Sequence, residues 1–600
     1  MSAPSPALLA GSIVNVAITA DGKPLNSTYQ VLTVDIWTGV NKLPRARLVI
    51  ADGSPNTATF PISETTTLIP GASLEIALGY DGGQSTVFSG LVCQQGISIS
   101  RNGPSQLIVE ATDKAAVMTL ARKNAIFDQT TDSKVIEKLI SQAGLGADVK
   151  ATTEVLPAVV QFYCSDWDLM LVRAQLNGMV VVVTSAGKVK VAPPDTAAPP
   201  VLTLTYGQSI LDLRAGMDAT DQYKASAIQS QAWDPATQQV AVSGQASTSV
   251  KAPGNLSSEQ LAGVFDVKQY LQQTAGTLAP AELTAWSSAE LLKTRLAKIR
   301  GDVQFQGSAL AEVGAMVTLA GLGDRFNGAA YVSGVHHRVA QGLWLTSATI
   351  GLSPDWFAAT APQMVAPGAS GQLPAAANLQ TGVVLKTDQD PDGEYRVQVS
   401  LPLLQAGTLG LWARLGGFYA SNGFGAEFYP ETGDEVVVAF MNGDPRFPVI
   451  LGALYSKKNP PPVPPDGENS QKTIVTRAGM RLDFFDKETA LEISTKKKHS
   501  IRLDDKDGKL TIKDSNGNTV VLADSGISID SAAKIALTAK GDISLAAQGK
   551  LVLKGQAGVD IAGATISAKA DTSFAAQGSA EAKLTSGGIV TVQGGIVKIN

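Results

Sequence analysis

The side chains that could do chemistry are few in this sequence and stand far apart. The 600 residues include three histidines and two cysteines. His336 and His337 are neighbours in a segment that alternates like a strand, so their side chains point to opposite faces and cannot grip one metal ion together. His499 follows three lysines in a turn-like segment. We expect a structural role for the histidine pair and no metal site.

One loop has the spacing of a calcium ligand set. Asp388, Asp390 and Asp392 precede Gly393 in the pattern D-x-D-x-D-G that opens an EF-hand loop. The twelfth position, where a bidentate Glu belongs, is Val399, and no helical patterns flank the loop. We therefore predict a β-turn between two strands. No Gly-Lys pair is followed by Ser or Thr and no G-x-S-x-G occurs, so we predict neither a cofactor nor a catalytic residue, and hence no enzyme.

Composition and charge narrow the class of protein. The net charge is −5 with both signs spread along the chain, which excludes the clustered basic face of nucleic-acid binding. The first 22 residues have no basic start and no long apolar run, so we expect synthesis in the cytoplasm without a signal peptide. Cys93 and Cys164 lie in apolar strand-like segments outside any C-x-x-C. This context favours buried free thiols, and a disulfide between the two cysteines is the alternative.

A repeat of apolar pairs runs through the last part of the chain, from about residue 526 to 600. The members of a pair are two residues apart and the pairs recur every eight residues, with slips of one residue after Ile561 and before Val597. A spacing of two puts both side chains on one face of a strand, whereas a helix would place them about 200° apart. We predict a stack of short strands, a β-solenoid, whose first pairs are Ile527/Ile529, Ile535/Leu537, Ile543/Leu545, Leu551/Leu553 and Val559/Ile561.

Such short strands need partners, because even a two-stranded hairpin is marginally stable in water. Two arrangements would supply them. One chain could coil with three octads in each turn, or several chains could wrap one common core. The short period of eight residues favours several chains.

The chain before the repeat divides into β-rich segments. Strand patterns separated by Asp-Gly and Gly-Gly turns fill the first 99 residues, helical patterns follow, and a further helix is predicted over 285–300. Five alternating segments between residues 382 and 455 predict a small closed barrel of the OB type. A run rich in Ala, Pro and Gly precedes this barrel, as is typical of linkers, and a stiff Pro-rich run follows it. Apolar pairs nine or ten residues apart then lead into the octads.

Several motifs make the sequence resemble the VgrG-type spike proteins of contractile injection systems, a family that joins a phage tail hub to its central spike. The most specific motif lies in the predicted barrel, where FYPETGDEVVVAFMNGDPRFPVILGALYSKKNPPP spans residues 428–462. The resemblance covers nearly the whole chain. Its other motifs span residues 159–178, 326–351, 390–399, 411–415, 476–484 and 514–520.

The resemblance implies a mainly β fold with minor α content: two hub β-barrels with helical insertions, an OB-fold barrel and a C-terminal trimeric β-helix. The expected divisions follow the order of the family. They are a first hub β-barrel at 1–105, a helical and strand insertion at 106–200, a second hub β-barrel with its helix at 201–356, a linker at 357–379, the OB-fold barrel at 380–456, a Pro-rich linker at 457–472, a β-helix neck at 473–525 and an octad-repeat shaft at 526–600.

The resemblance also implies a structural role and a set of partners. The protein would be a homotrimer whose hub binds an Hcp-like inner-tube protein and baseplate proteins, with possible effector cargo and a transient contact with a target membrane. A PAAR-repeat tip protein would bind the last residues, Ile596, Val597, Ile599 and Asn600. The particle would be extracellular or of the type VI class, and would release the spike on firing. A phage hub–spike, a spike with hydrolytic activity and a trimeric adhesin are the alternatives.

Overall fold

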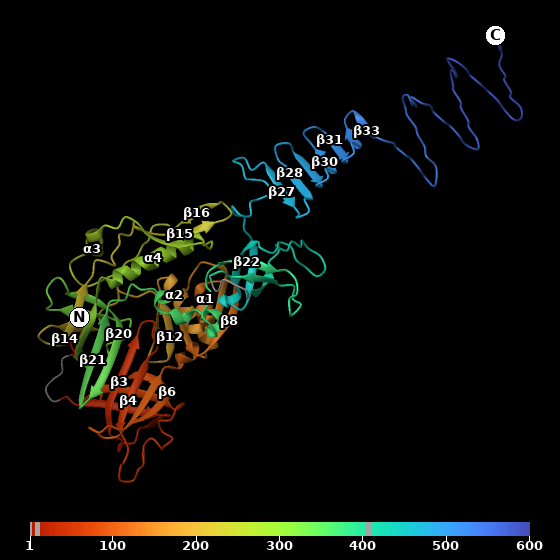
Figure 1. Cartoon of the computed structure of the whole chain (residues 1–600). Helices are drawn as coiled ribbons and strands as arrows, with labels where there is room; N and C mark the ends of the chain where they lie inside the picture. The colour runs from red at the N-terminus through yellow and green to blue at the C-terminus, as the bar shows by residue number, and fades with distance from the viewer. Residues whose placement is uncertain (1–2, 7–11, 404–409, 600) are drawn as a thin grey trace. The chain divides into compact units, whose positions relative to one another are not determined.

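The computed structural model describes residues 3–6, 12–403 and 410–599, and the chain forms two compact units, Met1–Leu454 and Tyr455–Asn600 (Figure 1). Both units are built mainly from strands, and the few helices lie in the first unit. The predicted fold class, mainly β with minor α content, is confirmed. No helix in the described ranges is long and apolar enough to cross a membrane.

A 13-stranded sheet forms the frame of the first unit. Its N-terminal half consists of β1 (Val14–Ala20), β2 (Lys23–Pro24), β3 (Val31–Gly39), β4 (Arg45–Ala51), β5 (Ser73–Tyr80), β6 (Ser85–Ser98) and β7 (Gln106–Thr112). Its second half consists of β13 (Leu202–Thr205), β14 (Ile210–Met217), β18 (Ile299–Gln306), β19 (Met316–Ala320), β20 (Gly328–Ala340) and β21 (Leu343–Ile350).

The two halves of this sheet have two main cores, with Val339 and Trp344 of the second half packed into the first core, and they share one hydrogen-bonded path. Alternation explains each core: in β4, Ala46, Leu48 and Ile50 are buried while the residues between them are not. Antiparallel pairing of β3 with β20, from Gly39 opposite Gly334 to Thr33 opposite Ala340, joins the halves. The two segments in which hub barrels were expected, 1–105 and 201–356, therefore share one sheet through this pair of strands.

An insertion between the two halves has its own core. It contains η1 (Lys114–Thr119), the ribbon of β8 (Arg122–Thr130) and β10 (Leu156–Ser165), the helices α1 (Asp132–Gln142) and α2 (Asp166–Leu176), and the small sheet of β9 (Gly146–Val149), β11 (Val180–Val183) and β12 (Lys188–Ala192). The predicted cap of α2 forms, because the Ser165 side chain accepts a hydrogen bond from the backbone N–H of Asp168. Arg173 on α2 binds Asp132 on α1 through two nitrogens, at 2.5 and 2.9 Å. This pair ties the two helices together.

The helix expected over 285–300 is α4, Pro280–Ala297. It begins earlier because Pro280 suits the first turn and the Glu282 carboxylate accepts the backbone N–H of Ala279 at 3.1 Å. It ends at Ala297 because the chain enters β18 at Ile299. Near it lie α3 (Ser258–Phe265) and the three-stranded sheet of β15 (Ile228–Asp234), β16 (Gln239–Val242) and β17 (Tyr270–Thr274).

The predicted five-stranded barrel is present and closed. Its strands are β22 (Gln380–Lys386), β23 (Val397–Ser400), β24 (Leu411–Leu415), β25 (Glu435–Phe440) and β26 (Pro448–Ala453), in the order β22-β23-β24-β26-β25. The segment before it holds three short helices, α5 (Phe357–Thr360), η2 (Pro362–Met364) and η3 (Gly368–Gly371), and η4 (Met441–Gly443) follows β25.

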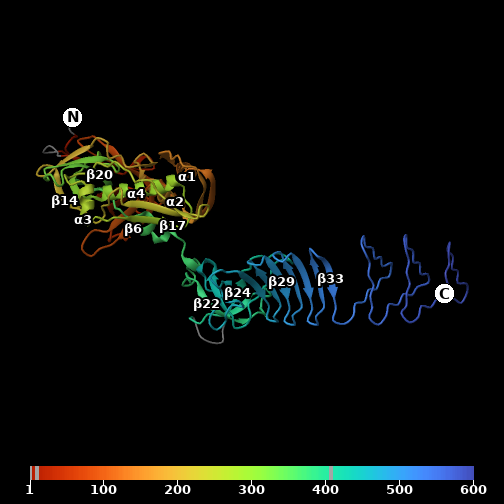
Figure 2. The ribbon, with the colours of Figure 1, turned by 90° about the horizontal axis from the view of Figure 1, so that it is seen from above.

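The second unit begins as a meander of seven antiparallel strands (Figure 2). They are β27 (Gln471–Val475), β28 (Arg481–Phe485), β29 (Ala490–Ser494), β30 (Ser500–Asp504), β31 (Lys509–Lys513), β32 (Thr519–Ala523) and β33 (Gly526–Asp530). Within the described residues 531–599 the chain forms no further strand and its ribbon continues as open turns (Figure 2).

Candidate functional site: the apolar face of the C-terminal sheet

The two neighbouring histidines occupy opposite faces of β20, as the alternation predicts. His336 Nε2 lies 2.9 Å from Asp35 Oδ1, and its ring stacks on Trp37 with centroids 4.9 Å apart. His337 is buried, with Nδ1 2.9 Å from Thr346 Oγ1. Both therefore hold strands of the large sheet together. Within the described ranges, no group of three or more His, Cys, Asp or Glu side chains could hold a metal ion.

Burial of His337 predicts a loss of stability in acid. Burial, and secondarily the charge of His336, lower the pKa of His337 from 6.5 to about 3. Below pH ~6.5 this histidine is protonated in the unfolded chain but stays neutral in the folded chain. The free energy of unfolding therefore falls as the pH is lowered to ~3, by about 1.4 kcal/mol per pH unit. His337→Asn should make this decline shallower. Urea unfolding of the unaltered protein and of the variant between pH 7 and 4 measures this difference. If the free energy of unfolding fell equally with pH in both, the acid effect would belong to other groups.

The aspartate-rich loop is a turn that Asp390 organises. Its carboxylate accepts the backbone N–H groups of Asp392, Glu394 and Arg396 at 3.3, 2.9 and 3.1 Å. The Arg396 guanidinium adds a contact at 2.6 Å, and this hydrogen bond is the main reason why the pKa of Asp390 lies well below its usual range. Both carboxylate oxygens are thus bound by donors of the loop itself, and the backbone N–H of Gly393 donates to the carbonyl of Asp390 at 3.1 Å, which closes the predicted β-turn.

The two cysteines are free, as expected, but the expectation that both are buried is wrong. Cys93 is exposed on β6 and Cys164 is half-buried on β10. The reason is local: Phe88, Gly90 and Val92 are the buried residues of β6, so Cys93 falls on the outward side of the same alternation. Burial raises the pKa of the Cys164 thiol.

A buried pair of charges on α4 escaped the sequence analysis. Glu290 and Lys293 are 3% and 5% exposed. Burial raises the pKa of Glu290 and lowers the pKa of Lys293 to about 8. Both side chains contact the chain segment around Trp356, which enters the linker. Their i, i+3 spacing on the predicted helix indicated that the two side chains share one helix face. The sequence did not show which segment would cover that face.

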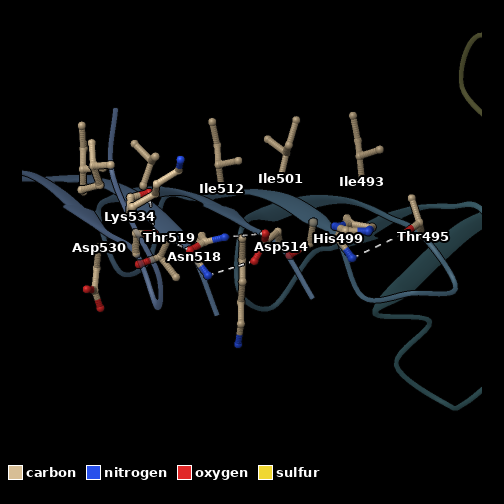
Figure 3. Close-up of a pocket in the computed structure, with 16 residues that line it drawn as sticks. Ile493, Thr495, His499, Ile501, Ile512, Asp514, Asn518, Thr519, Asp530 and Lys534 are labelled. Atoms are coloured by element: carbon tan, nitrogen blue, oxygen red, sulfur yellow. Dashed lines mark hydrogen bonds between the residues drawn. The ribbon is translucent and has the colours of Figure 1, made fainter. Parts of the chain in front are cut away.

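The largest unpartnered feature of the second unit is one face of the meander β27–β33. The register puts the apolar pairs in two columns that cross the sheet, since Ile501 lies opposite both Ile493 and Ile512. Figure 3 shows Ile493, Ile501 and Ile512 standing in a row on one side of the ribbon. The first column is Ile474, Leu482, Ile493, Ile501, Ile512, Val520 and Ile529, and the second is Phe484, Leu491, Leu503, Leu510, Leu522 and Ile527.

These columns, which we call the apolar face, stay uncovered in the single chain. Ile493, Ile512 and Ile529 are 46%, 43% and 59% exposed. Full burial of an aliphatic side chain contributes about 1.5–3 kcal/mol, so each of them leaves roughly half of that unrealised. Contiguous apolar surfaces of this kind mark interaction sites.

The opposite face of the same sheet is polar and already satisfied. Arg481 binds Asp483 through two nitrogens at 2.8 and 2.9 Å, and this bond lowers the pKa of Asp483 to about 2. Arg502 contacts Glu488, Glu492 and Asp504 at 2.8, 3.2 and 3.0 Å. The charged side chains of one face are therefore paired within the chain, whereas the apolar side chains of the other face have no covering element.

The side chains of the octad segment are exposed to solvent in the single chain. Ile535, Leu537, Ile543 and Leu545 are 53–70% exposed. The predicted tip residues Ile596, Val597 and Ile599 are 83%, 48% and 91% exposed, and Asn600 lies outside the described residues. The structure brings these tip residues against no other element of the described chain.

Three family models match the chain in order along it. The family described as the Alg8 N-terminal domain matches residues 10–341, more than half of the 600 residues. The type VI secretion system/phage-baseplate injector OB domain matches residues 380–455, which is the closed barrel. The phage baseplate V C-terminal trimerisation domain matches residues 490–552, which include most of the apolar face and the first octads.

Curated relatives match a short stretch. The type VI secretion system spike protein VgrG4b of Pseudomonas aeruginosa is 39% identical over 51 residues, 8% of this chain and 6% of that protein. The actin cross-linking toxin VgrG1 of Vibrio cholerae is 41% identical over 51 residues, 8% of this chain and 5% of that protein. A tail protein from Neisseria meningitidis has a structure similar to 57% of this chain and 98% of its own, at 15% identity and a TM-score of 0.43.

These matches confirm the predicted resemblance to the VgrG-type spike proteins. The injector barrel and the trimerisation domain occur in the expected order, and both curated relatives are VgrG proteins. The alignments span under a tenth of those relatives, so what the complete relatives do and bind is not carried over with the match.

Proposed function

Because the chain belongs to the family of the Alg8 N-terminal domain and continues into an injector OB barrel and a trimerisation domain, we propose that it forms the central spike of a contractile injection machine. The apolar face carries this proposal. A sheet with one satisfied polar face and one exposed apolar face suits a three-sided prism in which each chain supplies one wall. The octads continue the same prism as the shaft of the needle.

The proposed assembly is a homotrimer. Three copies would bury the two apolar columns against one another and pair the backbone of residues 531–599, which forms no strands within one chain. Closure of the prism would also leave no free lateral edge in the shaft, and this suits a rigid needle. The single-chain coil with three octads in each turn is the competing arrangement.

A heat-resistant trimer is the test of this proposal. We expect the purified chain to have three times its mass of 62.2 kDa by light scattering, and to stay trimeric in SDS without boiling. Saturated backbone pairing and a buried core oppose dissociation. A mass of one chain at micromolar concentration would contradict the shared core and favour the single-chain coil.

The hub and the tip would bind different partners. We place an inner-tube protein of the Hcp class and baseplate proteins at the large sheet of the first unit, and a PAAR-repeat tip protein at Ile596, Val597, Ile599 and Asn600. Effector cargo and brief contact with a target membrane belong to the same proposal, as does release of the spike on firing. The role is mechanical rather than enzymatic, since the chemistry-bearing side chains described above serve turns and strand contacts.

A hub–spike of a contractile-tailed phage is the second candidate, because the barrel family is described as serving both type VI systems and phage baseplates. Neighbouring genes separate the two. Genes for a sheath, tube, baseplate and AAA+ ATPase favour an injection particle, and genes for a capsid and terminase favour a phage.

A further inference from the structure

Three buried side chains of the hub hold three consecutive residues, 355–357, at the point where the chain enters the predicted linker. Lys293 Nζ donates to the carbonyl of Asp355 at 2.7 Å. The indole Nε1 of Trp356 donates to Glu290 Oε2 at 2.6 Å, and the backbone N–H of Phe357 donates to Gln175 Oε1 at 2.8 Å. Glu290, Lys293 and Gln175 come from two helices, α4 and α2, so this stretch is fixed to both.

Burial makes these contacts strong. Glu290, Lys293 and Gln175 are 3%, 5% and 8% exposed, so breaking a bond would leave a polar group without water. The Lys293 ammonium also lies 5.2 Å from the centre of the Trp356 ring. Further along, the Arg122 guanidinium donates to the carbonyls of Gln363 and Met364. The hub therefore holds the chain from Asp355 to Met364, a segment that we call the anchor.

The later part of the linker is bonded to the barrel instead. The backbone N–H of Ala376 donates to the carbonyl of Gly443 at 2.8 Å. Arg446 Nη2 donates to Gln372 Oε1 at 2.9 Å, and Asn442 Nδ2 lies 3.2 Å from Ser370 Oγ. Both Asn442 and Gly443 belong to η4 of the barrel.

Three residues, Val365, Ala366 and Pro367, lie between the anchor and η3 (Gly368–Gly371), whose Ser370 makes the first of these bonds to the barrel. Val365 is 66% exposed, and neither Val365 nor Ala366 makes a hydrogen bond to any residue within the described ranges. Pro367 follows with its φ fixed by the ring. The free part of the linker is thus far shorter than the 23 residues from 357 to 379 that composition indicates.

We propose that Asp355–Met364 is a fixed anchor on the hub and that bending between hub and barrel is confined to Val365–Ala366. A two-residue hinge restricts the directions that the barrel can take, whereas a free linker of 23 residues would not. In the proposed spike, this restriction would help to align hub and needle on one axis. The anchor and hinge themselves do not depend on that function.

Trypsin cleavage at two introduced lysines in the full chain tests the proposal. Val365→Lys adds a site in the hinge, and Ala359→Lys adds a matched exposed site in the anchor. Proteolysis requires local opening, so we expect the fragment ending at residue 365 to appear at least tenfold faster than the one ending at 359. Adding Trp356→Phe, which removes the indole donor, should speed cleavage at 359 at least threefold and leave cleavage at 365 unchanged.

Equal cleavage rates at the two sites would overturn the proposal. Hydrogen exchange on the unaltered chain gives a second measure that no variant can disturb. The amides of Phe357 and Ala359, which donate to Gln175 and to the carbonyl of Trp356, should exchange at least tenfold more slowly than those of Val365 and Ala366. Uniform fast exchange would contradict the anchor, and uniform protection would contradict the hinge. Neither readout requires trimer formation, so either can fail while the proposed function stands.

Discussion

Ile512→Asp should abolish the trimer. Ile512 lies in the first apolar column between Ile501 and Val520, and three copies would place three carboxylates in one layer of a shared core. Burial of an unpaired ion costs several kcal/mol, and the two residues opposite Ile512 in the register, Ile501 and Val520, carry no charge. Light scattering should then give the mass of one chain, 62.2 kDa, in place of three.

The neighbouring residue provides the matched control. Thr511 is on the same strand but on the opposite, polar face, where it lies opposite Arg502. Thr511→Asp introduces the same charge beside a guanidinium and should leave the trimer intact. If Ile512→Asp assembled as well as Thr511→Asp, the apolar face would be exposed to solvent in the assembly, and the three-walled prism would be wrong.

Gly307→Ala should destabilise the hub by about 1–3 kcal/mol, the usual cost of overpacking a core. A Cβ at Gly307 would lie 2.1 Å from Cδ2 of Trp344. The indole cannot move aside easily, because Trp344 is 1% exposed and stacks on Tyr80 with ring centroids 5.2 Å apart. The φ of Gly307 is not in the left-handed region, so the cost is steric. The hub transition in calorimetry should shift to lower temperature.

Two further variants separate the clash from a general effect of substituting glycine. Gly96→Ala in β6 meets nothing within 4 Å and should leave the transition unchanged. Trp344→Leu shortens the side chain that the new methyl group meets. The double variant Gly307→Ala/Trp344→Leu should therefore lose less stability than the two single changes added together. If the two single losses of stability simply added, the effect of Gly307→Ala would not come from a clash with the indole.

The sequence by itself determined the features that depend on local periodicity. Pairs such as Leu482/Phe484 and Ile501/Leu503 predicted strands with one apolar face, and the register confirms that arrangement. The five segments of the OB barrel followed from the same alternation. These features were predictable because a strand shows its buried face every second residue, whatever it packs against.

Tertiary structure decided what depends on residues far apart in the chain. The pairing of β3 with β20, which joins the two halves of the 13-stranded sheet, connects residues about 300 positions apart. The fixing of Trp356 by Glu290 and Lys293 follows from the packing of a distant chain segment on a helix. No periodicity encodes such contacts, because each of them depends on where the fold brings two distant segments together.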